Sequence, residues 1–145
     1  LRPPARRGAL RLGGRCVRYL LDTHTLLWAL TAPDRLGPAS STILADPSST
    51  IVVSAASAWE ISTKQRIGKL PHADALVGGY ARHLDRLGAE RLPIDETHAL
   101  LAGALQWDHR DPFDRMLAAQ AMVESLTLLS SDDAFSRLAG LAVQW

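Results

Sequence analysis

Short apolar runs alternate along the chain with segments in which apolar residues recur at helical spacing. The runs with the length and composition of buried strands are residues 17–21, 50–53, 91–94, 127–129 and 141–143. The segments predicted as helices are 23–30, 38–45, 54–67, 74–87, 95–107, 112–123 and a short stretch after 130. This alternation predicts an α/β fold with a doubly wound, mostly parallel sheet. Pro93 has no backbone N–H, so its strand is expected at a sheet edge.

Four acidic residues follow or flank these predicted strands. Asp22 directly follows the first run, and Glu60 lies in the helix after the second run. Asp132 follows the fourth run, while Asp114 begins the helix that leads into it. In parallel sheets, functional sites form where strands pass into helices at their carboxyl ends. We therefore expect the four carboxylates to converge at one edge of the sheet.

Each of these acids also has a structural explanation when taken alone. Asp22 and Asp132 stand where a helix N-cap is wanted, a role worth roughly 1 kcal/mol. Ser57 and Glu60 match the S-x-x-E pattern of a capping box. Asp114 occupies the third position of its predicted helix, where a negative charge is favourable. Capping explains any single acid, but it does not explain why all four occur at matching strand ends.

A cluster of carboxylates requires a compensating positive charge, because like charges raise one another's pKa values. Oxygen ligands without a nearby Cys or His set favour Mg²⁺ or Mn²⁺. Such an ion would suit phosphodiester hydrolysis, since it neutralises phosphate charge and lowers the pKa of a bound water. Glu60 and Asp114 are both candidates for accepting the proton of that water, and the sequence does not choose between them.

The chain resembles the PIN-domain ribonucleases of the VapC toxin type. The motifs that carry the resemblance are LLDTHTLLW (20–28), SAASAWEISTK (54–64), HRDPFDRMLAAQA (109–121) and TLLSSDDAF (127–135). The resemblance covers residues 17–145, and the segment from His109 to Arg115 is its most discriminating part. It implies a three-layer α/β/α sandwich with a mostly parallel central sheet, and cleavage of RNA with Mg²⁺ or Mn²⁺.

The resemblance also implies roles for individual residues and for partners. The acids expected to bind the metal and to be catalytic are Asp22, Glu60, Asp114 and Asp132. Ser130 stands in the position of the family's supporting hydroxyl, and Thr23 is expected either to hydrogen-bond near the metal or to cap a helix. Further expectations are a homodimer and a small antitoxin whose tail puts a basic side chain into the acidic site, where a guanidinium can replace the metal's charge.

Charged neighbours of these motifs are expected to be structural. Asp111 is interpreted as a helix cap because Pro112 follows it, and Asp133 as an acid in the first turn of a helix. Lys64 lies four residues after Glu60, the spacing of a helical salt bridge. For Arg115 we expect an ion pair with an acid rather than contact with phosphate.

The aromatic and histidine side chains leave two interpretations open. His24 and His109 either touch substrate or, as is more common for lone histidines, are structural. The tryptophans are expected in the core or at an interface, with base stacking as the alternative; they are Trp28, Trp59, Trp107 and Trp145.

Charge is distributed unevenly along the chain. The full sequence has 16 basic and 15 acidic residues, and six of the basic residues are arginines within residues 1–18. Residues 19–145 therefore carry 10 basic and 15 acidic residues, a net charge of −5. This charge does not by itself predict nucleic-acid binding, but metal ions can reverse the local sign.

The 145 residues are expected to form one domain over residues 17–145, after a basic and disordered extension over residues 1–16. A nucleic-acid-binding arm or an Arg-rich targeting segment is the alternative for that extension, and we expect the natural start to lie near Val17. No apolar run approaches the roughly 20 residues of a membrane span, and no signal-peptide pattern is seen. The single Cys16 favours a reducing, cytoplasmic setting.

Two other functions fit parts of the pattern. A phosphatase or phosphotransferase could use Asp22 as a nucleophile, but such enzymes commonly have a second Asp two residues on, where this chain has His24. A non-catalytic, receiver-like interaction module is the other alternative. It would tolerate loss of Glu60 and Asp132, whereas the nuclease needs both for metal binding.

Overall fold

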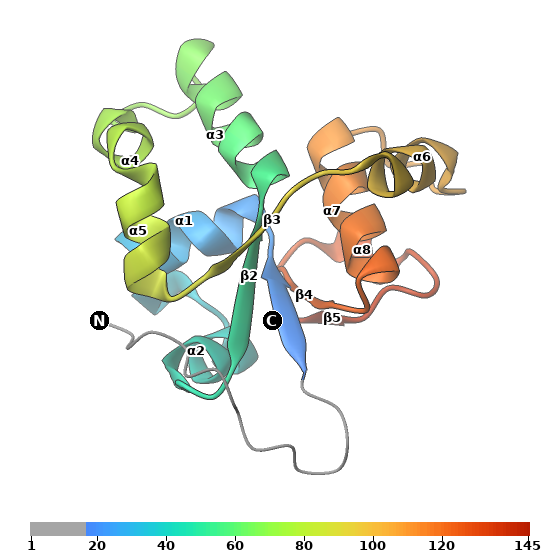
Figure 1. Cartoon of the computed structure of the whole chain (residues 1–145), viewed down its shortest axis with the longest axis horizontal. Helices are drawn as coiled ribbons and strands as arrows, with labels where there is room; N and C mark the ends of the chain where they lie inside the picture. The colour runs from blue at the N-terminus through green and yellow to red at the C-terminus, as the bar shows by residue number, and fades with distance from the viewer. Residues whose placement is uncertain (1–16) are drawn as a thin grey trace.

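The computed structural model describes residues 17–145 (Figure 1), so the predictions for residues 1–16 lie outside the described residues. The strands are β1 (Arg18–Leu21), β2 (Thr50–Ser54), β3 (Glu90–Leu92), β4 (Thr127–Leu129) and β5 (Val143–Gln144). The helices are α1 (Thr23–Thr31), the 3₁₀ helix η1 (Pro33–Arg35), α2 (Pro38–Ala45), α3 (Ala55–Arg66), α4 (Asp74–Gly78), α5 (Tyr80–Leu87), α6 (Glu96–Ala104), α7 (Pro112–Val123) and α8 (Asp133–Ser136). The predicted alternation of strands and helices is confirmed.

The five strands form one parallel sheet in the order β3-β2-β1-β4-β5. β1 lies in the middle, with Leu20 opposite Val52 on one side and Leu128 on the other. β3 lies at the edge that Pro93 predicted, and it ends one residue before that proline. Because all strands run the same way, their carboxyl ends share one edge of the sheet, and Asp22 directly follows the strand in its middle.

Helices cover both faces of the sheet, which confirms the three-layer α/β/α sandwich (Figure 1). Successive residues of a strand point to opposite faces. Leu20 and Leu128 accordingly pack against Leu117 of α7 and Phe135 of α8. Leu21 and Leu129 pack in the second core cluster, whose helical members are Leu26, Leu44, Ile61, Leu76 and Leu84, from α1 to α5.

Four predicted boundaries are wrong. The strand expected at 91–94 is β3, Glu90–Leu92, so Pro93 and Ile94 lie outside it. The single helix expected over residues 74–87 is divided into α4 and α5, because the chain leaves helical geometry at Gly79. The strand expected at 141–143 is formed by Val143 and Gln144 instead. The helix expected to reach residue 107 ends at Ala104. Within the described residues, no helix is long and apolar enough to cross a bilayer.

Candidate active site

Asp22 is placed by the central strand. Its backbone N–H donates to the carbonyl of Leu129 at 3.2 Å, so pairing with β4 continues to the acid itself. Carboxylate Oδ1 accepts the N–H of Thr25 at 2.7 Å, which makes Asp22 the N-cap of α1. Oδ2 accepts the hydroxyl of Ser130. The side chain is only 6% exposed, so a buried acid is held in one orientation at the carboxyl end of β1.

Ser130 connects Asp22 to Asp132. The serine follows β4, and its hydroxyl oxygen also accepts the backbone N–H of Asp132 at 3.0 Å. The carboxylate of Asp132 accepts the N–H of Ala134 at 2.9 Å and caps α8, as expected from its position. Asp132 itself is exposed, so one serine links a buried acid to an accessible one.

Glu60 lies in the middle of α3 and is 4% exposed. One carboxylate oxygen, Oε2, pairs with Lys64, which confirms the expected helical salt bridge. The other oxygen, Oε1, is buried and has no hydrogen-bond partner. A buried carboxylate oxygen without a donor is costly, so this atom fits a site that binds a cation.

Asp114 has a perturbed pKa. The pKa of its carboxyl is raised to about 6, chiefly by burial; the hydrogen bond to His109 opposes this shift, and the neighbouring charges of Asp111 and Glu60 add to it. His109 Nε2 donates to Oδ2 of Asp114 at 2.7 Å. Asp111 is the predicted cap of α7, accepting the N–H of Asp114 at 3.0 Å. Buried acids with raised pKa values cluster at functional sites.

Helices α1 and α3 are joined by a hydroxyl pair. Thr23 Oγ1 donates to Ser57 Oγ at 3.1 Å, and both residues are buried. The capping box expected from Ser57 and Glu60 is wrong, because the N-cap of α3 is Ser54, three residues earlier. Ser57 therefore lies inside the helix, one turn before Glu60, where its hydroxyl connects the helix to the residue after Asp22.

The structure groups the four acids as two pairs. Asp22 and Asp132 share Ser130, while Glu60 and Asp114 lie within electrostatic range of each other. Within the described residues, the four do not supply three ligand atoms that all lie within 4.8 Å of one another. The structure therefore brings these acids together as two pairs and not as one compact cluster of four, and Mg²⁺ is commonly held by one or two carboxylates completed by water.

A different set of residues in the described chain does meet that 4.8 Å limit, namely Asp95, His98 and Glu124. His98 Nδ1 accepts the N–H of Asp95 at 3.1 Å, and Nε2 pairs with Glu124 at 2.8 Å. Both ring nitrogens are thus used by protein groups on opposite sides of the ring. Asp95 caps α6 as predicted, and this cluster joins α6 to the end of α7.

Two residues of the most discriminating motif make contacts that the sequence did not specify. His109, for which a structural role was the commoner interpretation, contacts Asp114, a candidate metal-binding acid. The Asp-Pro pair between the two residues marks the start of a helix, and this is the sequence feature that indicates that the chain turns there and brings them together. The ion pair expected for Arg115 is wrong. Its guanidinium instead donates to five backbone carbonyls, those of Ala102, Gly103, Leu105, Trp107 and His109.

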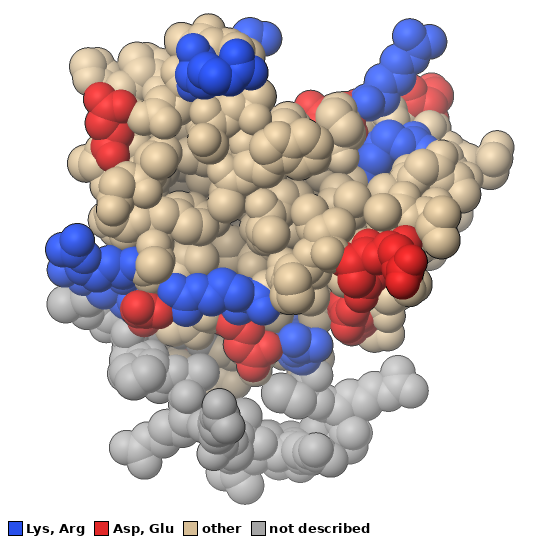
Figure 2. All heavy atoms as spheres, turned by 45° about the horizontal axis from the view of Figure 1, so that its top comes forward, with Lys and Arg blue, Asp and Glu red and all other residues tan. Residues whose placement is uncertain are grey.

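A hollow of about 390 Å³ lies beside the acids. Its lining includes Thr23, His24, Lys64, Lys69 and Asp111. Figure 2 tilts the carboxyl edge of the sheet toward the viewer and shows charged side chains around the rim of that face, with neutral residues in the middle. The hollow thus combines residues next to the candidate acids with two lysines that suit a phosphate backbone.

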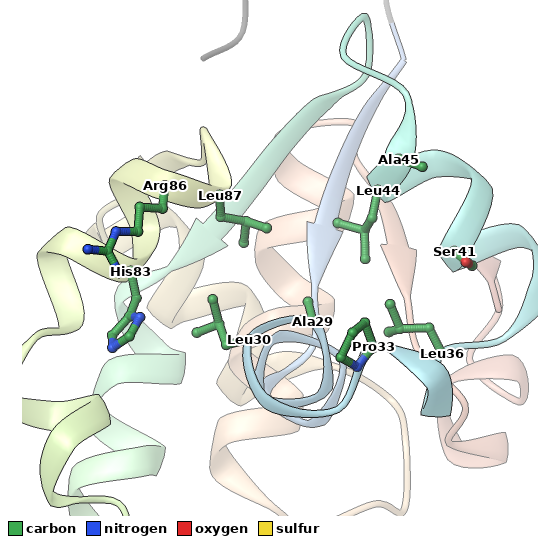
Figure 3. A pocket seen from close by; sticks show the side chains of 10 residues that line it. All are labelled: Ala29, Leu30, Pro33, Leu36, Ser41, Leu44, Ala45, His83, Arg86 and Leu87. Atoms are coloured by element: carbon green, nitrogen blue, oxygen red, sulfur yellow. The ribbon is translucent and has the colours of Figure 1, made fainter. Parts of the chain in front are cut away.

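A larger hollow of about 540 Å³ lies between α1, α2 and α5 (Figure 3). Leu30, Leu44 and Leu87 converge in it from these three helices, with His83 and Arg86 at one side. It contains none of the four candidate acids and is mostly apolar. This hollow is therefore separate from the candidate active site.

The chain matches the family model of the PIN domain over residues 19–141. It is 38% identical over 56 residues to Ribonuclease VapC16 of Mycobacterium tuberculosis, an alignment that spans 39% of this chain and 40% of that protein. The fold is similar to VapBC2 from Rickettsia felis, solved bound to a promoter DNA fragment, with a TM-score of 0.66, 18% identity, and coverage of 88% of this chain and 98% of that one.

Two further solved structures share the fold. A toxin-antitoxin complex from Klebsiella pneumoniae has a TM-score of 0.60 at 17% identity, covering 88% of this chain and 96% of that chain. VapBC-5 from Mycobacterium tuberculosis, of the VapBC family of toxin-antitoxin systems, has a TM-score of 0.54 at 19% identity, covering 90% and 97%. The family match over most of the chain agrees with the strand order and with the buried acids, and this chain therefore belongs to the PIN-domain family.

Proposed function

We propose that this protein is a Mg²⁺- or Mn²⁺-dependent endoribonuclease and the toxin component of a toxin–antitoxin pair. The observation that carries the proposal is Glu60 Oε1, a buried carboxylate oxygen without a hydrogen-bond partner, beside Asp114 with its raised pKa. Two acids that repel each other, one buried and one half-buried, favour a bound cation. The relative named as a ribonuclease and the toxin–antitoxin structures of similar fold support the same function.

The residues proposed to hold the ion are Asp22, Glu60, Asp114 and Asp132. When bound, the ion would neutralise phosphate charge and make a water acidic enough to yield hydroxide. The protein orients each acid through a neighbour: Ser130 holds Asp22, Lys64 holds Glu60, and His109 holds Asp114. Thr23 supports the site indirectly, through its hydrogen bond to Ser57.

The proposal is tested by cleavage of a labelled single-stranded RNA with Mn²⁺. Asp22→Asn and Asp114→Asn should each lower the rate by more than about 100-fold, beyond the loss usual for outer-shell residues. Asp133→Asn is the matched control, because Asp133 is an exposed acid in the first turn of α8 and adjoins Asp132. Full activity in either site variant, with unchanged circular dichroism, would refute the assignment.

The cell-level part of the proposal concerns partners and location. RNA as substrate implies a cytoplasmic enzyme, and an antitoxin tail with a basic side chain would replace the metal's charge in the acidic site. The mostly apolar hollow between α1, α2 and α5 gives such a protein a surface to cover.

Affinity capture from the native cells should recover one small protein that stops RNA cleavage when added back. Sedimentation analysis of the purified chain tests the proposed homodimer.

A further inference from the structure

A row of aromatic rings runs along one side of α1. The ring centroids of His24 and Trp28 lie 5.7 Å apart, and those of Trp28 and Trp145 lie 5.6 Å apart. His24 and Trp28 are four residues apart and share one helix face. His24 is exposed and both tryptophans are partly exposed, so the row is an accessible surface rather than sealed core.

Both ends of this row reach the candidate active site. His24 follows Asp22 by two residues and lines the hollow that contains Thr23 and Lys64. At the other end, Trp145 lines a hollow of about 210 Å³ together with residues 130–133, which include Ser130 and Asp132. The aromatic row therefore connects two hollows that adjoin the proposed catalytic residues.

An arginine side chain lies over the aromatic row, and contacts with residues 37 and 39 fix the position of Trp145. The guanidinium of Arg35 lies 5.1 Å from the ring centroid of Trp28. Trp145 packs tightly on Gly37, where an added Cβ would lie 2.6 Å from the indole Cδ1 and Nε1 atoms, and its carbonyl accepts the N–H of Ala39 at 3.3 Å. Aromatic faces combined with arginine are how proteins bind unpaired nucleotides without strict sequence preference.

We propose that Trp28 and Trp145, with His24 and Arg35, form a stacking subsite for an unpaired RNA base that flanks the scissile phosphate. The proposal rests on the ribonuclease function proposed above and adds to it a base-binding surface formed by named residues of this chain. Recognition of single-stranded RNA commonly places splayed bases on aromatic side chains. The subsite selects unpaired RNA, because a base inside a duplex does not expose its face.

The first test measures binding without catalysis. The full chain in chelator is titrated into a fluorescein-labelled, unstructured RNA of about ten nucleotides, followed by anisotropy. Trp28→Ala should weaken the Kd about 5- to 140-fold, while Trp28→Phe, which keeps an aromatic face and the packing, should stay within a few-fold of the wild type. Leu100→Ala is the control, because Leu100 is an exposed apolar residue of α6 at 74% exposure. Equal binding by wild type, Trp28→Phe and Trp28→Ala would overturn the subsite.

The second test locates the stacked base. Abasic ribose is placed at each position of the same RNA in turn. With the wild type, one or two positions should lose at least about 5-fold in affinity, and with Trp28→Ala those positions should lose nothing further. An identical abasic profile for both proteins would overturn the subsite, even if Trp28→Ala is less stable.

Cleavage with Mn²⁺ separates this inference from the function on which it rests. If the wild type cleaves RNA but its binding does not depend on Trp28, the stacking subsite is wrong and the nuclease assignment stands. If binding depends on Trp28 but no metal ion gives cleavage, the subsite stands and the nuclease assignment is wrong. Absence of any RNA binding and of any cleavage would overturn both.

Discussion

Nε2 of His109 lies 2.7 Å from Oδ2 of Asp114, with the imidazole also packed against Trp107 at a ring-centroid distance of 4.7 Å. The histidine belongs to the loop before α7 and the acid to its first turn. The hydrogen bond fixes the direction in which this carboxylate points. It also lowers the pKa of Asp114, against the increase that burial causes. His109 is therefore a positioning residue for an acid proposed to bind metal.

Replacing His109 by Ala should lower both Mn²⁺ affinity and RNA cleavage by about 10- to 100-fold, the usual cost of losing a partner behind a metal ligand. Calorimetric titration with Mn²⁺ and a cleavage assay measure the two effects. His83→Gln is the control, because His83 lines the apolar hollow of α1, α2 and α5 and not the acidic site. Wild-type metal affinity in His109→Ala would show that the contact does not position the acid.

Asp114→Asn should stabilise the metal-free protein at neutral pH. Burial raises the pKa of this carboxyl from 3.8 to about 6, so between these pH values the folded state binds its proton more tightly than the unfolded state does. The stability of the wild type therefore falls as the pH rises through this range, and the lower value persists above it. Asparagine stays neutral throughout. The variant's advantage in chelator should be small near pH 4 and reach a plateau above about pH 6.

Thermal melts in chelator at several pH values measure this difference. Asp133→Asn provides the comparison with an exposed acid in the first turn of a helix. An acid that is needed at a functional site but lowers the stability of the fold is an expected trade-off between activity and stability. A variant that is less stable than the wild type at every pH would contradict the burial of an uncompensated charge at Asp114.

Arg115 should matter for stability. Its guanidinium donates to carbonyls at the end of α6 and in the loop that carries His109, among them Ala102 and Trp107 at 2.9 and 2.8 Å. Removal takes a charged donor from these carbonyls, so Arg115→Ala should cost about 2–4 kcal/mol of unfolding free energy, since hydrogen bonds to charged groups are worth about 1.5–3 kcal/mol each and are not additive. Arg115→Lys should restore little of the lost stability, because the compact ammonium group of lysine cannot donate to all of these carbonyls at once.

Urea unfolding measures the effect. The matched control is Arg110, an exposed arginine five residues earlier in the chain. Arg110→Ala should change the free energy of unfolding by less than about 0.5 kcal/mol. Arg115→Ala should also slow RNA cleavage, because the loop would no longer hold His109 against Asp114. A variant as stable as the wild type would contradict the role of Arg115 as a clamp on these carbonyls.

The strand pattern was readable from the sequence because the three central strands, β2, β1 and β4, are largely buried, whereas the edge strands β3 and β5 are not. Leu20, Val52 and Leu128 stand in short uninterrupted apolar runs, as parallel strands do. Acids that follow such runs are informative because topology alone brings the strand ends together. Asp22 and Asp132 could for this reason be expected near each other, although 110 positions separate them in the chain, and the structure connects them through Ser130.

Side-chain partners were harder to predict, because one local pattern fits several arrangements. The S-x-x-E spacing of Ser57 and Glu60 fits a capping box, but the helix begins earlier, since Ser54 at the end of β2 caps it first. Arg115 has acidic neighbours in sequence, yet the helix end of α6 lies closer in space and offers several carbonyls. Neither outcome follows from spacing, because the first depends on where β2 ends and the second on how α6 packs on α7.

The packing of Trp145 on Gly37 gives a last prediction about the aromatic row. A Cβ at position 37 would lie 2.6–2.7 Å from Cδ1, Nε1 and the backbone carbon of Trp145, closer than atoms can approach without movement. Gly37→Ala should cost about 1–3 kcal/mol of stability, as overpacking does. It should also shift the tryptophan fluorescence, because Trp145 must move from its present position beside Trp28. Gly103→Ala is the control: nothing lies within 4 Å of its Cβ position in α6, and alanine should stabilise that helix by up to about 1 kcal/mol. Equal stability and equal fluorescence in both variants would show that Trp145 is not held against position 37.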